Sequence, residues 1–276
     1  MKNLTKMMVA VIVTICLITL SACGKASTTN ENTWQKVEKS KTITIGFDNT
    51  FVPMGFKDKD GTNKGFDIDL ANAVFKTYGI KVKWQPITWS LKEQELKNGN
   101  IDLIWNGYSV TPEREKLVKF SEPYMEGGDI LLTKKSSDIT KISEMKGKTI
   151  GAQSGSSQYQ VFNDQPTKLK DLVAGKTIVQ YSTFEQGLLD VKNGRIDALL
   201  VDQVYANYYL KQSNETNLFN SIPVDFESSP MAVGARKADS VLIEKINAGI
   251  NKLVANGEFK TISERWFGKD VYPVTK

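Results

Sequence analysis

Histidine is missing from the 276-residue sequence, and cysteine occurs only twice. The absence of histidine excludes histidine-dependent catalytic triads, and it removes the commonest general base and the commonest zinc ligand. Both cysteines, Cys16 and Cys23, lie within the first 23 residues, so the rest of the chain can form neither a disulfide nor a cysteine metal site. We therefore expect no metal and no other cofactor.

Long apolar runs are scarce as well. The run Met7–Leu20 has fourteen residues, whereas a membrane-spanning helix needs about 20. Because two lysines precede it, the run is typical of the apolar region of a signal peptide. Residues 20–23 (LSAC) resemble the bacterial lipobox, whose cysteine is lipidated and becomes the new N-terminus. We predict a signal peptide over residues 1–22 and a lipid at Cys23 that holds the protein on the extracellular face of the cell membrane. The alternative is a plain signal peptide with a chance cysteine.

Neither sign of charge is in large excess. The net charge of +5 falls to +3 when Lys2 and Lys6 leave with the signal peptide, and no basic run with interleaved aromatic residues occurs. These features argue against a nucleic-acid partner. Residues 23–40 are polar and contain Trp34 and Val37 as their only large apolar side chains, so we predict a lipid-anchored flexible tether there.

What the sequence does contain is a distinctive stretch at residues 101–114 (IDLIWNGYSVTPER). Its apolar start is typical of a buried strand. Thr111 and Pro112 suit the cap and first position of a helix, which places Arg114 in the first turn. Loop N–H groups, the Ser109 hydroxyl and the arginine fork together form a physically suitable receptor for a carboxylate. The alternative is an ordinary loop with a surface arginine paired to a neighbouring glutamate.

A second copy of this plan occurs later in the chain. Residues 97–102 (KNGNID) are echoed by residues 192–197 (KNGRID), and in each copy Asn-Gly suits a helix end while Ile-Asp begins an apolar strand. The second strand ends at Asp202. The repetition predicts two α/β lobes of similar plan, with Arg114 and Asp202 facing one another across a cleft.

The lobe boundaries follow from the same pattern. We assign residues 41–133 and 232–276 to the first lobe, with a strand at Ile130–Thr133 before the chain crosses, and residues 134–231 to the second lobe. In the second lobe, residues 153–158 (QSGSSQ) form a Gly/Ser loop that opens a helix and can cradle an anion. The loop lacks the Walker lysine, which argues against a nucleotide, and a plain capped turn is the alternative.

Three segments resemble the extracellular solute-binding protein family 3, the polar amino-acid-binding proteins of bacterial ABC importers. They are residues 65–70 (GFDIDL), residues 107–114 (GYSVTPER) and residues 266–268 (WFG), and the resemblance runs from about Lys41 to Lys269. It implies an α/β, periplasmic-binding-protein-like fold of two lobes joined by two crossing strands, with the ligand cleft between them. It also implies a monomeric binding lipoprotein, not an enzyme, that delivers a polar L-amino acid to a membrane permease.

The resemblance further implies a set of ligand-binding residues from both lobes: Asp48, Phe51, Trp89, Gly107, Ser109, Arg114, Gln153, Ser156, Ser157 and Asp202. Arg114 would hold the ligand α-carboxylate, with the region of Gly107, Ser109 and Ser157 donating to it. Asp202 would take the α-ammonium, together with the Gly107 carbonyl or the Ser109 hydroxyl. The rings of Phe51 and Trp89 would enclose the ligand side chain.

The identity of the ligand stays open at this point. Asp48 and Gln153 would line the side-chain end, with Ser156 nearby, and Gln153 can both donate and accept a hydrogen bond. No extra base for a second carboxylate is visible, which disfavours aspartate and glutamate. Histidine, glutamine, arginine and cystine remain, in that order. A surface adhesin or sensor, or an enzyme that uses Asp202 and Asp48 as acid and base, are the alternative functions.

Overall fold

The computed structural model describes residues 32–227 and 229–273, and Thr33–Lys276 form one compact unit. The expected signal peptide at residues 1–22 and the expected lipid at Cys23 lie outside the described residues. No helix among the described residues has the length and apolar character that crossing a membrane would require.

The first of two five-stranded sheets has the order β5-β1-β6-β13-β7. Its strands are β1 (Thr42–Phe47), β5 (Lys81–Pro86), β6 (Leu103–Ile104), β7 (Val118–Phe120) and β13 (Gly234–Arg236). Strand β1 is parallel to β5 and β6, and β13 is antiparallel to β6 and β7. We call this sheet and its helices lobe 1.

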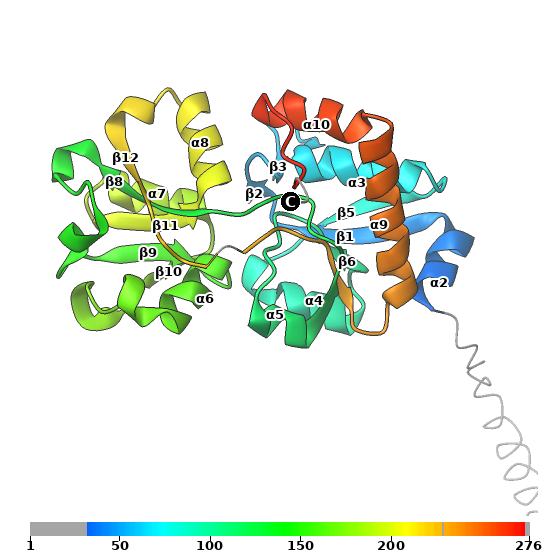
Figure 1. The fold of residues 1–276 in the computed structure, drawn as a ribbon, viewed down its shortest axis with the longest axis horizontal. Helices are drawn as coiled ribbons and strands as arrows, with labels where there is room; N and C mark the ends of the chain where they lie inside the picture. Colours follow the sequence, from blue (N-terminus) through cyan, green and yellow to red (C-terminus); the bar gives the residue numbers. More distant parts are fainter. Residues whose placement is uncertain (1–31, 228, 274–276) are drawn as a thin grey trace, which may run out of the picture. The chain divides into compact units, whose positions relative to one another are not determined.

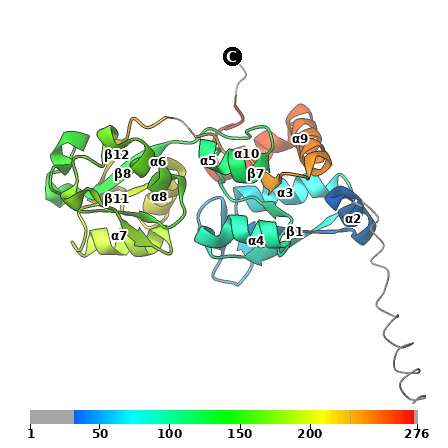
Figure 2. The ribbon, with the colours of Figure 1, turned by 90° about the horizontal axis from the view of Figure 1, so that it is seen from below.

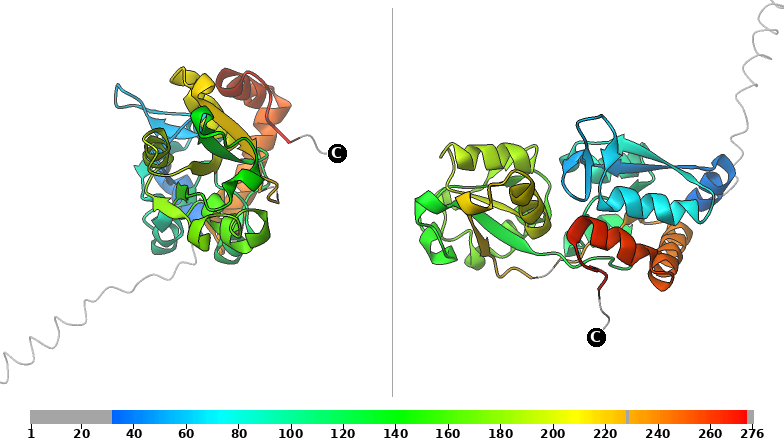
Figure 3. Two further views of the ribbon diagram at one scale, coloured as in Figure 1. Left: turned by 90° about the vertical axis from the view of Figure 1, so that its left-hand side faces the viewer. Right: turned by 90° about the horizontal axis from the view of Figure 1, so that it is seen from above.

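Helices cover both faces of the first sheet (Figure 1). One face carries α3 (Phe66–Lys76), α9 (Ser240–Ala255) and α10 (Glu258–Phe267), and the other carries α4 (Lys92–Asn98) and α5 (Pro112–Leu117). A small sheet of β2 (Thr50–Phe51), β3 (Gly55–Lys57) and β4 (Asn63–Lys64) lies on the side of lobe 1 that faces the other lobe (Figure 3).

The second sheet has the order β10-β9-β11-β8-β12 and, with its helices, forms lobe 2. Its strands are β8 (Asp129–Lys134), β9 (Ile150–Gln153), β10 (Val179–Tyr181), β11 (Ala198–Asp202) and β12 (Phe219–Pro223). The helices α7 (Phe184–Lys192) and α8 (Gln203–Gln212) pack on one face, and α6 (Ser157–Asp164) packs on the other. Short 3-10 helices complete the elements: η2 (Trp89–Leu91), η3 (Lys135–Ser137), η4 (Ile142–Met145), η5 (Pro166–Lys168), η6 (Ala174–Lys176) and η7 (Thr216–Leu218).

The chain crosses between the lobes earlier than the sequence suggests. The expected first lobe includes Ile130–Thr133, but β8 pairs antiparallel with both β11 and β12 in the second sheet. The first crossing therefore precedes Asp129. The reason is that a buried apolar run predicts a strand without specifying its partner. The chain returns between β12 and β13, and the two crossing segments are visible in Figures 1 and 2.

The expected tether is also corrected over its last eight residues, which form helix α2 (Thr33–Ser40). Trp34 and Val37 lie three positions apart, so they share one face of the helix, and both are buried against lobe 1. The Trp34 ring meets the Tyr78 ring edge-on at 5.0 Å. Two large apolar residues at helical spacing are thus enough to dock a segment whose composition is otherwise polar.

Candidate functional site

The candidate site lies where parallel strands of both lobes end. Asp48 directly follows β1 and Gly107 lies three residues after β6, while Gln153 and Asp202 are the last residues of β9 and β11. Because β1 is parallel to β6 and β9 is parallel to β11, each pair of strand ends meets at one edge of its sheet. The crevice outside such strand ends is the usual place for a ligand in an α/β sheet.

Residues from both lobes surround a cavity that, together with the solvent space at its opening, has about 260 Å³ of empty volume. The residues that line it are Asp48, Phe51, Trp89, Asn106, Gly107, Arg114, Gln153, Ser156, Ser157, Gln158, Phe184 and Asp202. Nine of the ten residues expected at the site are therefore brought together. The tenth, Ser109, lines a neighbouring cavity, and its hydroxyl lies 3.0 Å from that of Ser157 across the lobes.

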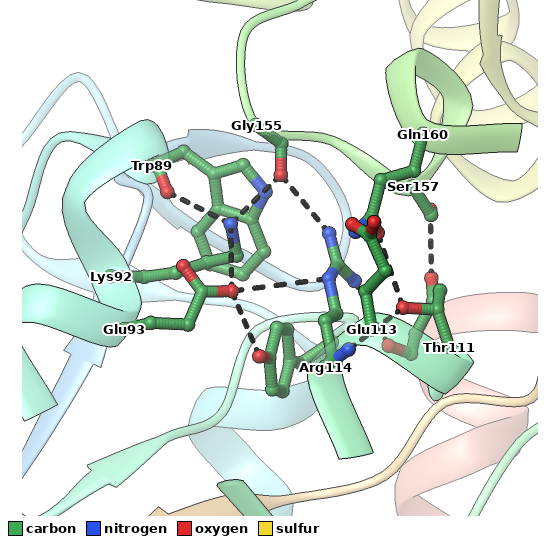
Figure 4. A network of polar contacts seen from close by, with 11 residues as sticks. Trp89, Lys92, Glu93, Thr111, Glu113, Arg114, Gly155, Ser157 and Gln160 are labelled. Carbon is green, nitrogen blue, oxygen red and sulfur yellow. Dashed lines mark hydrogen bonds and ion pairs between the residues drawn. The ribbon is translucent and has the colours of Figure 1, made fainter. Parts of the chain in front are cut away.

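Arg114 lines the cavity, and Figure 4 shows the polar contacts of its side chain. Its backbone N–H donates to the Thr111 hydroxyl at 3.3 Å, as the expected helix cap requires. Its guanidinium donates to the carbonyl of Ser109 at 2.9 Å and to that of Gly155 in lobe 2 at 3.0 Å. One N–H on each terminal nitrogen is left by these two bonds, which is the arrangement that a carboxylate binds bidentately.

The interpretation of Arg114 as a surface arginine is wrong. The side chain is 3% exposed, and its guanidinium stacks 4.6 Å above the Tyr108 ring. The carboxylate beside it belongs to Glu93, 3.9 Å from Nε, and not to a neighbour on its own helix.

Asp202 stands at the acidic part of the cavity. It lies opposite Asp129 in the β11–β8 pairing, and Gln158 donates to Asp129 at 2.6 Å. Burial, together with the nearby charge of Asp129, raises the pKa of Asp202 to about 8, and burial also raises the pKa of Asp129. Gln158 Oε1 is buried and has no hydrogen-bond partner among residues 32–227 and 229–273. This acidic pair can therefore hold a proton or accept a cationic group.

A cross-lobe hydrogen bond closes the other part of the cavity. Gln153 donates to Asp48 Oδ2 at 2.6 Å and to the carbonyl of Ser182 at 3.0 Å. Asp48 Oδ1 accepts from both the backbone N–H and the hydroxyl of Thr50, at 2.9 and 2.6 Å. These hydrogen bonds hold the carboxylate of Asp48 in a fixed position at the wall of the cavity.

Gly107 is held by a side chain from the GFDIDL segment. Asp67, fully buried at the start of α3, accepts the Gly107 N–H at 2.7 Å and the Tyr124 hydroxyl at 3.0 Å. Burial raises the pKa of Asp67 to about 7. Gly107 has φ +57°, and a Cβ would lie 2.6 Å from the Phe51 ring. Since its N–H is bound to Asp67, Gly107 is not free to donate this N–H to a ligand carboxylate in the way the resemblance implies.

Three residues that line the cavity are absent from the expected set: Asn106, Gln158 and Phe184. Asn106 accepts the Asp48 N–H, and only the packing of β1 beside β6 reveals this bond. Gln158 directly follows the expected Ser157 in the first turn of α6, so the predicted helix start is a signal that could have found it. Phe184 follows a helix cap, where a lone aromatic residue is more often core. Within residues 32–227 and 229–273, no cluster of acidic residues could hold a metal ion.

Comparison with known proteins adds the following. The model of the bacterial extracellular solute-binding proteins, family 3, matches residues 43–269. A substrate-binding protein of an ABC uptake transporter from Streptococcus pneumoniae, solved with bound histidine, is 54% identical, with coverage of 89% of this chain and 100% of that chain and a TM-score of 0.88. A polar amino acid ABC uptake transporter substrate-binding protein from Streptococcus thermophilus is 57% identical. The match covers 91% of this chain and 95% of that chain, with a TM-score of 0.59. The arginine-binding extracellular protein ArtP of Bacillus subtilis (strain 168) is 28% identical over 277 residues, with coverage of 97% of this chain and 98% of ArtP.

Proposed function

Because the chain belongs to the bacterial extracellular solute-binding proteins, family 3, we propose that it captures a polar L-amino acid outside the cell and delivers it to an ABC permease. The family consists of transport binding proteins, so the chain is a binding protein and not an enzyme. The expected signal peptide, the lipid at Cys23 and a monomeric protein on the extracellular face of the membrane form part of this proposal.

One observation carries the proposal: a buried Arg114 and a buried Asp202, from opposite lobes, line a single cavity. An L-amino acid presents a carboxylate and an ammonium on one carbon, so it can satisfy both groups together. Arg114 would hold the carboxylate, while Asp202 and the Gly107 carbonyl would hold the ammonium. A ligand that contacts both lobes stabilises the closed arrangement by its differential affinity.

We propose histidine as the first candidate ligand and arginine as the second. The Asp48–Gln153 pair offers an acceptor and an amide to the side-chain end, which suits an imidazole or a guanidinium. The relative from Streptococcus pneumoniae, 54% identical, is described with bound histidine, and ArtP is named for arginine. Glutamine follows because its side chain carries no cation, and cystine follows because its second ammonium comes with a second carboxylate, for which no extra base is visible.

Lobe motion is supported by the comparison of two relatives. The Streptococcus pneumoniae and Streptococcus thermophilus proteins have nearly equal identity to this chain, yet they superpose with TM-scores of 0.88 and 0.59. Similar sequences that superpose so unequally are expected when two rigid lobes adopt different relative orientations.

A thermal-shift panel tests the proposed function. Purified protein, unfolded and refolded to remove carried-over ligand, is heated with each L-amino acid and with cystine. A ligand that binds the native state stabilises it by mass action and so raises the melting temperature. At a ligand concentration of 100 times Kd, the free energy of unfolding increases by about 2.7 kcal/mol. We expect the largest rise with histidine or arginine. If no amino acid raises the melting temperature, the transport proposal is wrong and the adhesin or sensor function takes its place.

Proton release on binding tests the role of Asp202. In the closed site without ligand, burial and the charge of Asp129 raise the pKa of Asp202 to about 8, so its carboxyl holds a proton below that pH. A bound ammonium favours the ionised carboxylate and lowers that pKa, so binding releases a proton. Affinity therefore rises with pH toward about 8, by up to about tenfold per pH unit.

Titration calorimetry at pH 7, in two buffers of different ionisation enthalpy, counts the released protons. Asp129→Asn removes the neighbouring charge, so this variant should release fewer protons than the unaltered protein. Lys92 titrates in the same pH range and is common to both proteins, so the difference reports on the two aspartates. Equal proton release from both proteins would contradict the assignment.

A further inference from the structure

Lys92, at the first turn of α4, is a buried lysine that does not line the ligand cavity. Its side chain is directed at three acceptors: the carbonyl of Trp89 at 3.2 Å, a carboxylate oxygen of Glu93 at 3.2 Å and the carbonyl of Gly155 at 2.8 Å (Figure 4). An ammonium has three donors and no acceptor, so these contacts use its full capacity. Two of the acceptors belong to lobe 1, and Gly155 belongs to lobe 2.

The Gly155 carbonyl accepts from two cations of lobe 1. Arg114 donates to it at 3.0 Å beside the bond from Lys92. Glu93 compensates the two positive charges, because one of its oxygens lies 3.2 Å from Lys92 Nζ and 3.9 Å from Arg114 Nε. The Tyr108 hydroxyl holds the same oxygen at 2.9 Å. The network is therefore complete only when the Gly155 loop of lobe 2 is in place.

The Gly155 loop also lies directly on the backbone of lobe 1. Gly155 has φ +73°, and a Cβ built on it would lie 2.7 Å from Ser90 Cα and 3.4 Å from Lys92 Nζ. A glycine is thus required both by the left-handed backbone and by the close approach of the lobes. Burial and the charge of Arg114 lower the pKa of Lys92 to about 7. The buried ammonium is therefore disfavoured by its surroundings and depends on its three acceptors to compensate for lost water.

We propose that Lys92 and the Gly155 carbonyl form a cross-lobe latch that stabilises the closed arrangement whatever side chain the ligand carries. When the lobes separate, Lys92 exchanges the carbonyl for water, and only closure restores the bond. Arg114 would share its donors with the ligand carboxylate, whereas Lys92 does not line the ligand cavity. The apparent affinity for a ligand depends on how much the closed arrangement is populated. A latch that stabilises this arrangement therefore changes the affinity for every ligand by the same factor. Lys92 is a positioning residue, and the affinity part of this proposal rests on the proposed function.

Lys92→Met tests the latch, because it removes the ammonium and keeps an unbranched apolar side chain. Lys97→Met, an exposed lysine of the same helix, is the matched control. We expect the affinities for histidine and arginine, measured by calorimetry, to fall by the same factor, about tenfold to a hundredfold, since a hydrogen bond to a charged group is lost. Unchanged affinities, or a changed ratio between the two ligands, would overturn the proposal.

Small-angle X-ray scattering of the ligand-free protein separates the latch from the ligand. We expect Lys92→Met to have a larger radius of gyration than both the unaltered protein and Lys97→Met. This arm is informative even if no amino acid binds, so failure of the transport proposal and failure of the latch are distinguishable. An unchanged radius counts against the latch.

Gly155→Ala tests the same contact from lobe 2, where the fold of lobe 1 around Lys92 is untouched. Its control is Gly147→Ala, because Gly147 has φ +72° and no atom within 4 Å of a built Cβ. The two variants impose a similar backbone penalty, but only the first places a methyl group against lobe 1. We expect an enlarged radius of gyration for Gly155→Ala alone. The same radius in both variants would contradict the latch, even if Lys92→Met failed to fold.

Discussion

Arg114→Met is expected to weaken amino-acid binding severely. The guanidinium is 3% exposed and provides the fixed positive charge that we assign to the ligand carboxylate. Removal of one partner from a buried, hydrogen-bonded charge pair costs about 2–5 kcal/mol. Every 1.4 kcal/mol is a factor of ten, so the dissociation constant should rise about 30-fold to several thousand-fold.

Titration calorimetry with the ligand from the thermal-shift panel measures this loss. Arg195→Met is the matched control, because Arg195 is an exposed arginine that pairs with Asp190 on the surface of lobe 2. The control should bind with unaltered affinity. The thermal unfolding of Arg114→Met without ligand shows whether the variant is folded. A folded Arg114→Met protein that binds normally would refute the assignment of the carboxylate site.

Asp67→Ala should lower the stability of the protein more than any surface substitution. Asp67 is fully buried and accepts two hydrogen bonds, from the Gly107 N–H and the Tyr124 hydroxyl. Alanine leaves both donors buried without a partner, at about 1–3 kcal/mol each. The expected loss is about 2–6 kcal/mol in the free energy of unfolding, which for a unit of this size lowers the melting temperature by about 4–24 °C.

Urea unfolding and thermal unfolding measure the effect of Asp67→Ala. Asp67→Asn keeps an acceptor oxygen for the two donors and should retain most of the stability. Asp164→Ala, at an exposed position near the end of α6, should remain within about 0.5 kcal/mol of the unaltered protein. Equal stability of Asp67→Ala and Asp164→Ala would show that the bond to Gly107 contributes nothing.

Local signals in the sequence predict a good part of this structure. The Thr111–Pro112 pair predicts the start of α5, and the structure places Thr111 at its N-cap. The repeated Asn-Gly-x-Ile-Asp pattern indicates the strands that become β6 and β11. These predictions succeed because caps, turn residues and apolar runs act over a few neighbouring positions.

The errors concern relations between distant segments. The apolar run of β8 has the composition of a strand in either sheet, so the sequence does not specify that it pairs with β11 and β12. Helix α2 is short and polar, and its docking depends on a surface of lobe 1 that the sequence does not display. Composition alone therefore favoured a tether at Thr33–Ser40.

The candidate site also contains residues that local sequence signals predict and residues that only contacts between distant segments reveal. Residues that follow strands or begin helices, such as Asp48, Arg114 and Asp202, can be predicted from their positions and from the family resemblance. Asp129 lies near the site only because the strand register places it opposite Asp202. Lys92 contacts lobe 2 only because the Gly155 loop packs against lobe 1. Contacts between lobes depend on the closed geometry, which leaves no local pattern in the chain.

Asp202 is shared by two cavities: it lines the ligand cavity and also the space bounded by the crossing segments at Gly127–Gly128 and Pro223–Val224. Asp202 therefore lies between the ligand cavity and the segments that connect the two lobes. We expect that the proposed ligand ammonium, once bound at Asp202, also changes the electrostatic potential at these connecting segments.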